Sequence, residues 1–168
     1  MDSQAILAEI PRLRRYARAM LGDRAAADDL VQDTLERAWS RLKQWRQGSD
    51  LRAWLFGIMH NLRVDQLRRL KPITRPVEEG DYEQPTRATQ TDALELKDLE
   101  SALGQLPDEQ REVVLLVALE EMSYADIAAM LEIPAGTVMS RLSRGRERLR
   151  QIIAGVGDKP ANGLRVVR

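Results

Sequence analysis

Apolar residues recur along most of the chain at intervals of three and four positions, the spacing that places them on one face of an α-helix. In the first such segment, residues 3–21, Ile6, Ile10, Leu13 and Met20 share a face. The same periodicity predicts further helices over residues 24–42, 50–70, 93–103, 108–119, 124–131 and 135–153. Strand-like alternation is scarce, so the sequence predicts an all-α protein.

Residue types at the ends of the first helices agree with these boundaries. Gly22 follows the first helix, where glycine readily adopts the left-handed conformation that ends a helix. Asp23 and Asp50 precede the second and third helices, where a carboxylate can accept a free backbone N–H.

The helices form two groups separated by a stretch with few apolar residues. Residues 72–92 contain Pro72, Pro76, Gly80 and Pro85 together with several acids, and bury too little apolar surface to order themselves. We therefore predict two small helical domains joined by a flexible linker. The expected divisions are a first domain over 1–71, an acidic linker over 72–92, a second domain over 93–153 and a disordered tail over 154–168.

Composition excludes several classes of function. The 168 residues include no Cys and one His, which excludes a disulfide scaffold, a thiol nucleophile and a Cys- or His-rich metal site, so we expect no metal and no cofactor. No apolar run approaches the roughly 20 residues of a membrane helix. The N-terminus lacks a secretion signal, and we expect a soluble, cytoplasmic protein without membrane insertion.

The charges balance in number, with 26 Lys+Arg and 26 Asp+Glu, but not in position. Residues 1–71 are basic overall, and several arginines cluster within residues 141–150. Patches of this kind steer a protein toward nucleic acid more than its total charge does. The alternative for any one charge run is a solvated helical face.

The second predicted helix has a polar face that solubility alone does not require. Its acidic and amide side chains lie opposite its apolar side, although like charges one turn apart slightly destabilise a helix. This face suits a basic partner, and the alternative is a solvated acidic surface. Its members are Asp29, Gln32, Asp33 and Glu36.

The third predicted helix is apolar on two sides and is therefore expected to pack between neighbours. Trp45, Arg46 and Gly48 lie in the loop before it, where an aromatic ring and bases can hold a single nucleic-acid strand. The alternative is that the tryptophans are core or half-core residues, which we favour for all three, more for Trp39 and Trp54 than for Trp45. The polar positions of the helix are Arg52, Asn61, Arg63 and Arg68, and His60 is expected to be a packed or hydrogen-bonded side chain.

The strongest local pattern is a helix-turn-helix. Ser123 and Asp126 resemble a capping box, residues 132–134 form the turn, and Val138 and Leu142 anchor the second helix. The outer side of that second helix can reach base edges in a major groove, with Arg suited to guanine. The outer residues are Thr137, Ser140, Arg141, Ser143, Arg144 and Arg148.

With these residues in place, the chain resembles a bacterial RNA polymerase sigma factor of the extracytoplasmic-function (ECF) group of the sigma-70 family. The matching stretches are DDLVQDTLERAW (28–39), LRAWLFGIMHNLRVDQLRR (51–69) and LPDEQREVVLLVALEEMSYADIAAMLEIPAGTVMSRLSRGRERLR (106–150). Their order, with a Pro-containing segment between the second and third, is part of the resemblance.

The resemblance implies a non-catalytic protein that binds core RNA polymerase, directs it to promoter DNA and helps to open the duplex. By position, Asp29, Gln32, Asp33 and Glu36 match the part of region 2 that docks on the polymerase clamp helices. Residues of region 2 matching the minus-ten site are Trp45, Arg46, Gly48, Arg52, Asn61, Arg63 and Arg68, and the outer residues of the helix-turn-helix match the minus-thirty-five site in region 4. The family also implies an anti-sigma factor as a partner.

Two residues depart from the family pattern. Many relatives have Arg or Lys where this chain has Met139, which would remove one phosphate or base contact. Many helix-turn-helix units have Gly where this chain has Glu132, which would carry a small left-handed backbone cost.

Two other classes of function are weighed against the sigma factor. A stand-alone helix-turn-helix regulator would leave the acidic helix and the separate N-terminal domain without a role. For an enzyme we would look for a Cys, a second His, a Gly-rich phosphate loop or a convincing pair of carboxylates on facing helices, none of which the sequence offers, and no small-molecule substrate is expected.

Overall fold

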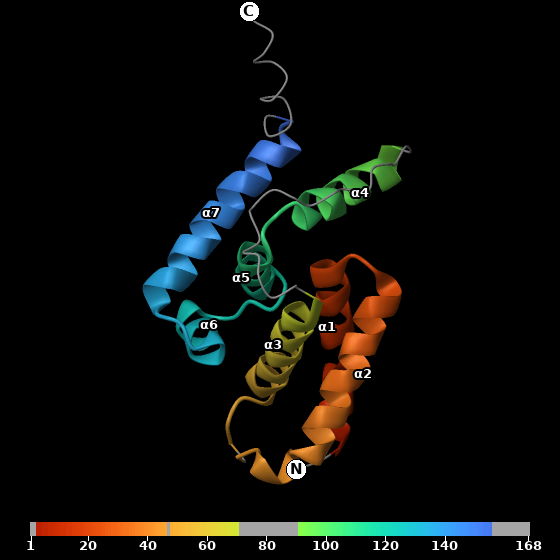
Figure 1. Ribbon diagram of the computed structural model, residues 1–168, viewed down its shortest axis with the longest axis vertical. Coiled ribbons are helices and arrows are strands. Elements are labelled where there is room, and N and C mark those ends of the chain that lie inside the picture. The colour runs from red at the N-terminus through yellow and green to blue at the C-terminus, as the bar shows by residue number, and fades with distance from the viewer. Residues whose placement is uncertain (1–2, 47, 71–90, 156–168) are drawn as a thin grey trace, which may run out of the picture.

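A computed structural model describes residues 3–46, 48–70 and 91–155, and all its regular secondary structure in these ranges is helical. The prediction of an all-α protein is therefore confirmed. Figure 1 shows the N-terminal helices side by side, with the C-terminal helices packed against them. In chain order the elements are α1 (Ser3–Leu21), α2 (Arg24–Ser40), the 3-10 turn η1 (Leu42–Gln44), α3 (Leu51–Leu70), α4 (Thr91–Gly104), α5 (Asp108–Ala118), α6 (Tyr124–Leu131) and α7 (Ala135–Ile153).

The predicted helix ends are confirmed at several positions. After α1, Gly22 adopts the left-handed conformation with φ +72°. The Asp23 carboxylate accepts a hydrogen bond from the Ala25 N–H at 3.1 Å, and Asp50 accepts from the Arg52 N–H at 3.0 Å. Both carboxylates satisfy donors that lack a partner within their own helix.

Some predicted boundaries are wrong by a few residues. The second helix ends at Ser40 instead of residue 42, and the chain continues into η1. Ser40 Oγ donates to the Arg37 carbonyl oxygen at 3.0 Å, a local bond that competes with continued helix. Thr91 and Asp92, assigned to the linker, begin α4, and both residue types are common at helix starts. The rest of the predicted linker, and the predicted tail from residue 156 onward, lie outside the described residues.

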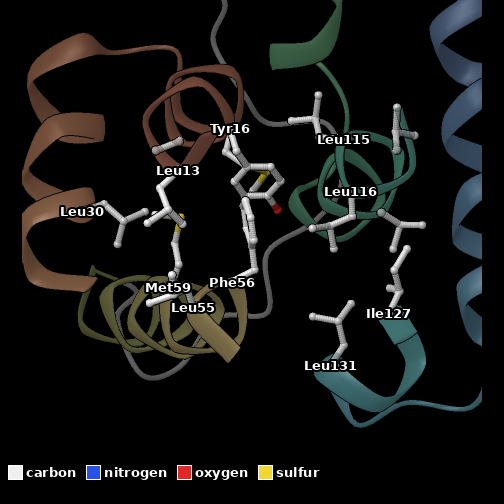
Figure 2. Packing of buried hydrophobic residues seen from close by; sticks show 14 of the residues in the cluster. Leu13, Tyr16, Leu30, Leu55, Phe56, Met59, Leu115, Leu116, Ile127 and Leu131 are labelled. Carbon is white, nitrogen blue, oxygen red and sulfur yellow. The ribbon is translucent and has the colours of Figure 1, made fainter. Parts of the chain in front are cut away.

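The helices α1, α2 and α3 share a common core, and α3 also packs against α6, so the prediction that it lies between neighbours is confirmed. Leu13, Leu30, Leu55 and Met59 are at most 2% exposed in this core. The Tyr16 and Phe56 rings meet edge to face, with centroids 5.0 Å apart. Figure 2 shows these side chains between α1, α2 and α3, with Tyr16 on the side that faces α5.

The C-terminal helices pack closely enough that one position requires glycine. Ile127, Val138 and Leu142 are buried where α6 and α7 meet α5. A Cβ atom on Gly145 would lie 2.7 Å from Val114 Cγ2, much closer than carbon atoms approach in proteins. The backbones of α5 and α7 therefore come together at Gly145.

The two groups of helices pack against each other, with contacts of α1 to α4 and α5 and of α3 to α6. Figure 2 shows the apolar side of this interface, where Tyr16 and Phe56 lie across from Leu116 and Leu131. The compact arrangement brings together charged residues that are far apart in the sequence, and these contribute to the surfaces described next.

Candidate nucleic-acid interface and acidic docking surface

The acidic face of α2 is exposed and unpaired. Asp29, Gln32, Asp33 and Glu36 all lie on the solvent side, while the opposite side of the helix buries Leu30, Val31, Thr34 and Ala38. None of the four exposed residues has an ion pair or a hydrogen bond of its side chain in the described part of the chain. We refer to these four residues as the acidic α2 face.

Asp28, on the same helix, differs from these four residues because its carboxylate pairs with arginines of α1. Asp28 Oδ1 lies 3.4 Å from Arg18 Nη2 and 3.9 Å from Arg14 Nε, both on α1. In the described part of the chain, the side chains of the acidic α2 face form no ion pair with these arginines and are open to solvent. Asp33 and Glu36 also line a shallow polar depression between α2 and α3 that includes Arg37, Asp65 and Arg69.

Some of the predicted minus-ten residues are exposed to solvent, and others form ion pairs with acids of neighbouring helices. Arg46, Asn61 and Arg68 are exposed. Arg52 is paired with Glu9 of α1, with Nε and Oε1 3.3 Å apart. Arg63 is largely buried and lies 3.2 Å from Asp108 of α5. The exposed members, rather than Arg52 and Arg63, are thus the ones free to meet a strand in this arrangement.

The tryptophans do not all lie where expected. Trp39 is 40% exposed at the end of α2, so the interpretation of this residue as core or half-core is wrong. Its position on the helix directs it away from the buried stripe of Val31, Thr34 and Ala38. Trp54 is half-buried, and its ring lies 6.5 Å from that of half-buried Trp45. Gly48 completes the loop, exposed and with φ +97°.

The helix-turn-helix has most of the local geometry that its sequence predicts, but only the Ser123 half of the predicted capping box forms, because in the described residues the Asp126 carboxylate makes no return bond to the Ser123 N–H. Ser123 Oγ accepts a hydrogen bond from the Asp126 N–H at 3.0 Å and caps α6. Glu132 adopts the predicted left-handed conformation, with φ 59° and ψ 48°, and turns the chain toward α7. Val138 and Leu142 are buried and hold α7 against its neighbours.

The outward side of α7 carries most of the predicted minus-thirty-five residues. Ser140, Ser143, Arg144 and Arg148 are exposed. Thr137 and Arg141 are partly buried, and Arg141 lies at the edge of this surface, 3.8 Å from Glu109 of α5. Met139, expected from the sequence to lack the contact that Arg or Lys makes in relatives, is 51% exposed beside Ser140 and belongs to the same outward surface. The helical repeat agrees with this position, because Met139 lies one turn before Ser143.

A cluster of buried charges between the two groups of helices was not predicted. Glu120 is fully buried and pairs with Arg12 and Arg15 of α1 at 3.3 and 3.7 Å. Arg111 donates to four backbone carbonyls, including that of Met20 on α1 at 2.8 Å. These contacts pair charges that would be costly to bury alone, although Glu120 Oε2 accepts no hydrogen bond in the described part of the chain.

His60 belongs to the same interface, where its Nδ1 lies 2.5 Å from Glu112 Oε2. The prediction of a packed, hydrogen-bonded histidine is confirmed. Burial lowers the pKa of His60, but the hydrogen bond to Glu112 and the negative charges of Glu112 and Asp108 outweigh it, so the pKa lies above its ordinary value. Arg141 opposes this shift.

The described residues contain no group of three or more side chains of the kinds that hold a metal ion. In the same part of the chain, no helix has the length and apolarity to cross a bilayer. The surfaces available for chemistry are thus an acidic helix face, an arginine-bearing helix-turn-helix and the exposed residues around α3. Together they give the described part of the chain the features of a helical protein with a helix-turn-helix and a separate acidic surface.

Comparisons with known proteins name the family. The chain matches the family described as "Sigma2 domain of PhyR" over residues 6–60 and "Sigma-70, region 4" over residues 96–149. It is 39% identical over 151 residues to the ECF RNA polymerase sigma factor EcfG of Rhodopseudomonas palustris (strain TIE-1), covering 88% of this chain and 82% of that protein. The chain belongs to the ECF RNA polymerase sigma factors and directs promoter-specific initiation of transcription.

Solved structures agree with this assignment. The sigma factor RpoE in complex with the anti-sigma factor NepR from Bartonella quintana is similar with a TM-score of 0.72 and 31% identity, covering 99% of this chain and 98% of that one. CnrH, in complex with the cytosolic domain of CnrY, is similar with a TM-score of 0.68 and 29% identity, covering 91% of this chain and 87% of that one. The prediction of sigma regions 2 and 4 is confirmed.

Proposed function

We propose that the acidic α2 face docks this sigma factor on the clamp helices of core RNA polymerase. The observation that carries the proposal is the unpaired state of Asp29, Gln32, Asp33 and Glu36 on a helix where Asp28 has two arginine neighbours. Open carboxylates attract a basic partner and also speed its correctly oriented encounter. In this scheme residues 1–71 form the module that binds polymerase and the minus-ten element.

The same module captures bases of the non-template strand at the minus-ten element. The residues assigned to this step are Trp45, Arg46, Gly48, Arg52, Asn61, Arg63 and Arg68. Removing a base from the stack costs a few kcal/mol, and a protein that binds the extruded base shifts the equilibrium toward the open duplex. The exposure of Arg46, Asn61 and Arg68 supports their role as first contacts.

The second module, residues 93–153, reads the minus-thirty-five element with α7 in the major groove. Ser140, Ser143 and Arg144 contact base edges, while Thr137, Arg141 and Arg148 contact the backbone or the edge of the groove. Two weak DNA modules carried by one polymerase gain from their high effective concentration. This explains how a chain with no net charge can select promoters.

This scheme needs no chemistry from the chain itself, which acts as a cytoplasmic, non-enzymatic specificity subunit without a cofactor or a small-molecule substrate. An anti-sigma factor is a further proposed partner, because the similar structures of RpoE and CnrH are complexes with NepR and with the cytosolic domain of CnrY. Such a partner would act by covering the surfaces that bind polymerase.

Transcription in vitro with core RNA polymerase tests the proposed function directly. We expect the purified chain to create start sites on genomic DNA fragments that core polymerase alone does not use. A stand-alone regulator would instead bind duplex DNA without polymerase and create no start sites. That second outcome would contradict the docking role of the acidic α2 face.

A further inference from the structure

Met139 is a large apolar side chain on the surface through which α7 is proposed to meet DNA. It is 51% exposed, follows buried Val138 and precedes exposed Ser140. Met139 and Ser143 lie one helical turn apart and line the same shallow hollow, together with Tyr124 of α6. The fold does not account for an apolar residue at this position.

Other exposed apolar residues do not share this setting. Leu7, Trp39, Leu70 and Leu99 lie on helices outside the helix-turn-helix, and Ile153 is the last residue of α7. Single exposed apolar residues are common on protein surfaces. Met139 and Tyr124, by contrast, are adjacent on the two helices of the DNA-binding unit and are both open to solvent. An open apolar position on a recognition helix affects which bases that helix can accept.

The chemistry of the major groove limits what Met139 can recognise. Most base-edge groups there are hydrogen-bond donors or acceptors, and the one apolar group is the 5-methyl of thymine. A methionine side chain has no donor and only a weak thioether acceptor. Against an amino group or a carbonyl oxygen of a base, the Met139 side chain would displace a water molecule without replacing its hydrogen bond. The methyl group of thymine makes no hydrogen bond to water, so contact with Met139 costs it none.

We propose that Met139 reads the 5-methyl group of one thymine in the minus-thirty-five element. The inference rests on the proposed function, in which α7 enters the major groove. Ser140 and Ser143 beside it can donate to or accept from any base, so they leave selection at that base pair to Met139. The flexible thioether can adjust to the methyl position without a change in the backbone.

Selection from a promoter library tests the first half of the proposal. Polymerase holoenzymes carrying the wild-type chain, Met139→Gln or Met139→Leu would select from fragments randomised in the minus-thirty-five element. Gln is similar in length but polar, and Leu keeps an apolar contact. We expect one position at which wild type and Met139→Leu enrich thymine and Met139→Gln does not.

Replacing that thymine with deoxyuridine tests the second half, because the change removes only the methyl group. We expect promoter affinity of the wild-type and Met139→Leu holoenzymes to fall about fourfold, the size expected for one buried methyl group. The Met139→Gln holoenzyme should bind both fragments equally. Circular dichroism and melting of the free variants would establish that each is folded, as the exposure of Met139 leads us to expect.

The outcomes separate this inference from the function on which it rests. If the wild-type holoenzyme initiates at no promoter, the proposed function fails. If it initiates normally but shows no thymine preference, or all three proteins show the same preference and the same effect of deoxyuridine, then Met139 is not the reader and only this inference is overturned.

Discussion

Arg144 is a residue whose DNA-contact role is predicted from the sequence and whose exposure the structure then shows. Its type and position on the second helix of the helix-turn-helix indicate a base contact. The structure adds that its side chain is exposed and that no acid in the described residues holds it in an ion pair, whereas Arg141, one turn earlier, lies near Glu109. Arg144 is therefore the better placed of the two to meet a base.

Replacing Arg144 with Ala should weaken promoter binding by about 1–3 kcal/mol and relax specificity at one base pair, as expected for loss of a base contact. The measurement is holoenzyme affinity for matched promoters that differ at single positions of the minus-thirty-five element. Arg150→Ala, which removes an equal charge from the last turn of α7, is the control and should change affinity less. If both variants lose the same affinity, Arg144 acts only through its positive charge and does not contact a specific base.

Gly145 is a residue whose role the sequence does not reveal, because its neighbours Arg144 and Arg146 suggest an ordinary exposed turn of helix. Only the packing of α7 on α5 shows that a Cβ atom would meet Val114. Gly145→Ala should therefore lower the free energy of unfolding by about 1–3 kcal/mol, the usual cost of overpacking.

A matched substitution in the same helix separates packing from helix propensity. Gly136, in the first turn of α7, has nothing within 4 Å of an added Cβ. Gly136→Ala should raise the free energy of unfolding by about 0.4–1 kcal/mol, because the unfolded chain loses freedom. Urea denaturation of the two variants measures both effects, and a stabilising Gly145→Ala would refute the close approach of α5 and α7.

At the scale of elements, α2 carries two independent patterns on one helix. Its buried stripe fixes it against α1 and α3, while the acidic α2 face takes no part in that packing. The charges of the face can therefore be changed without disturbing the helix. This independence makes α2 the best element for testing polymerase docking.

Reversing Asp33 and Glu36 to Lys should reduce affinity for core polymerase at least tenfold, since two attractive pairs become repulsive in a docking surface. The double variant Asp98→Lys, Glu100→Lys changes the net charge equally on α4, where both residues are exposed, and should bind nearly as wild type. Affinity would be measured at several salt concentrations, with helical circular dichroism as a check on folding. Similar losses in both double variants would show that net charge, and not the acidic α2 face, controls binding.

Elements were more predictable than their packing for a physical reason. Helices depend on local periodicity and caps, so Asp23, Asp50 and Ser123 could be placed from sequence alone. The interface depends on pairs such as Arg12 with Glu120, which lie 108 positions apart and separately look like ordinary surface charges. For the same reason the pairing of Arg63 with Asp108 did not follow from the sequence.

For the molecule as a whole, the His60–Glu112 pair links the packing of α3 against α5 to pH. The pKa of His60 is raised in the folded chain, so its contribution to stability is complete below its ordinary value near 6.5 and is lost as pH rises through the raised value. Asp108 strengthens this effect and Arg141 weakens it.

Wild type should therefore lose more unfolding free energy between pH 5.5 and 8.5 than His60→Gln, in which no proton is exchanged at this position. Urea denaturation at the two pH values measures the difference. Parallel pH dependence in the two proteins would show that folding does not favour the protonated form of His60.

The compact arrangement itself sets a limit on promoter binding. Elements centred about 25 base pairs apart are separated by roughly 85 Å along B-DNA, whereas a compact chain of this length has a radius of gyration of about 15 Å. The two modules must therefore separate if each binds its own element. Twenty positions separate the end of α3 from the start of α4 in the sequence, and a chain of that length spans at most roughly 70 Å, which allows much of that separation.

Separation would break the contacts of Glu120, Arg111 and His60 across the interface, and it would release Arg63 from Asp108 for its proposed role at the minus-ten element. The absence of native cysteine allows this to be measured with labels on Ser40→Cys and Glu147→Cys, exposed positions on α2 and α7. We expect the distance between the labels to lengthen by tens of ångströms when the chain joins core polymerase and promoter DNA. An unchanged distance in the active complex would mean that one module, and not both, makes the promoter contacts, because the packed modules cannot reach both elements at once.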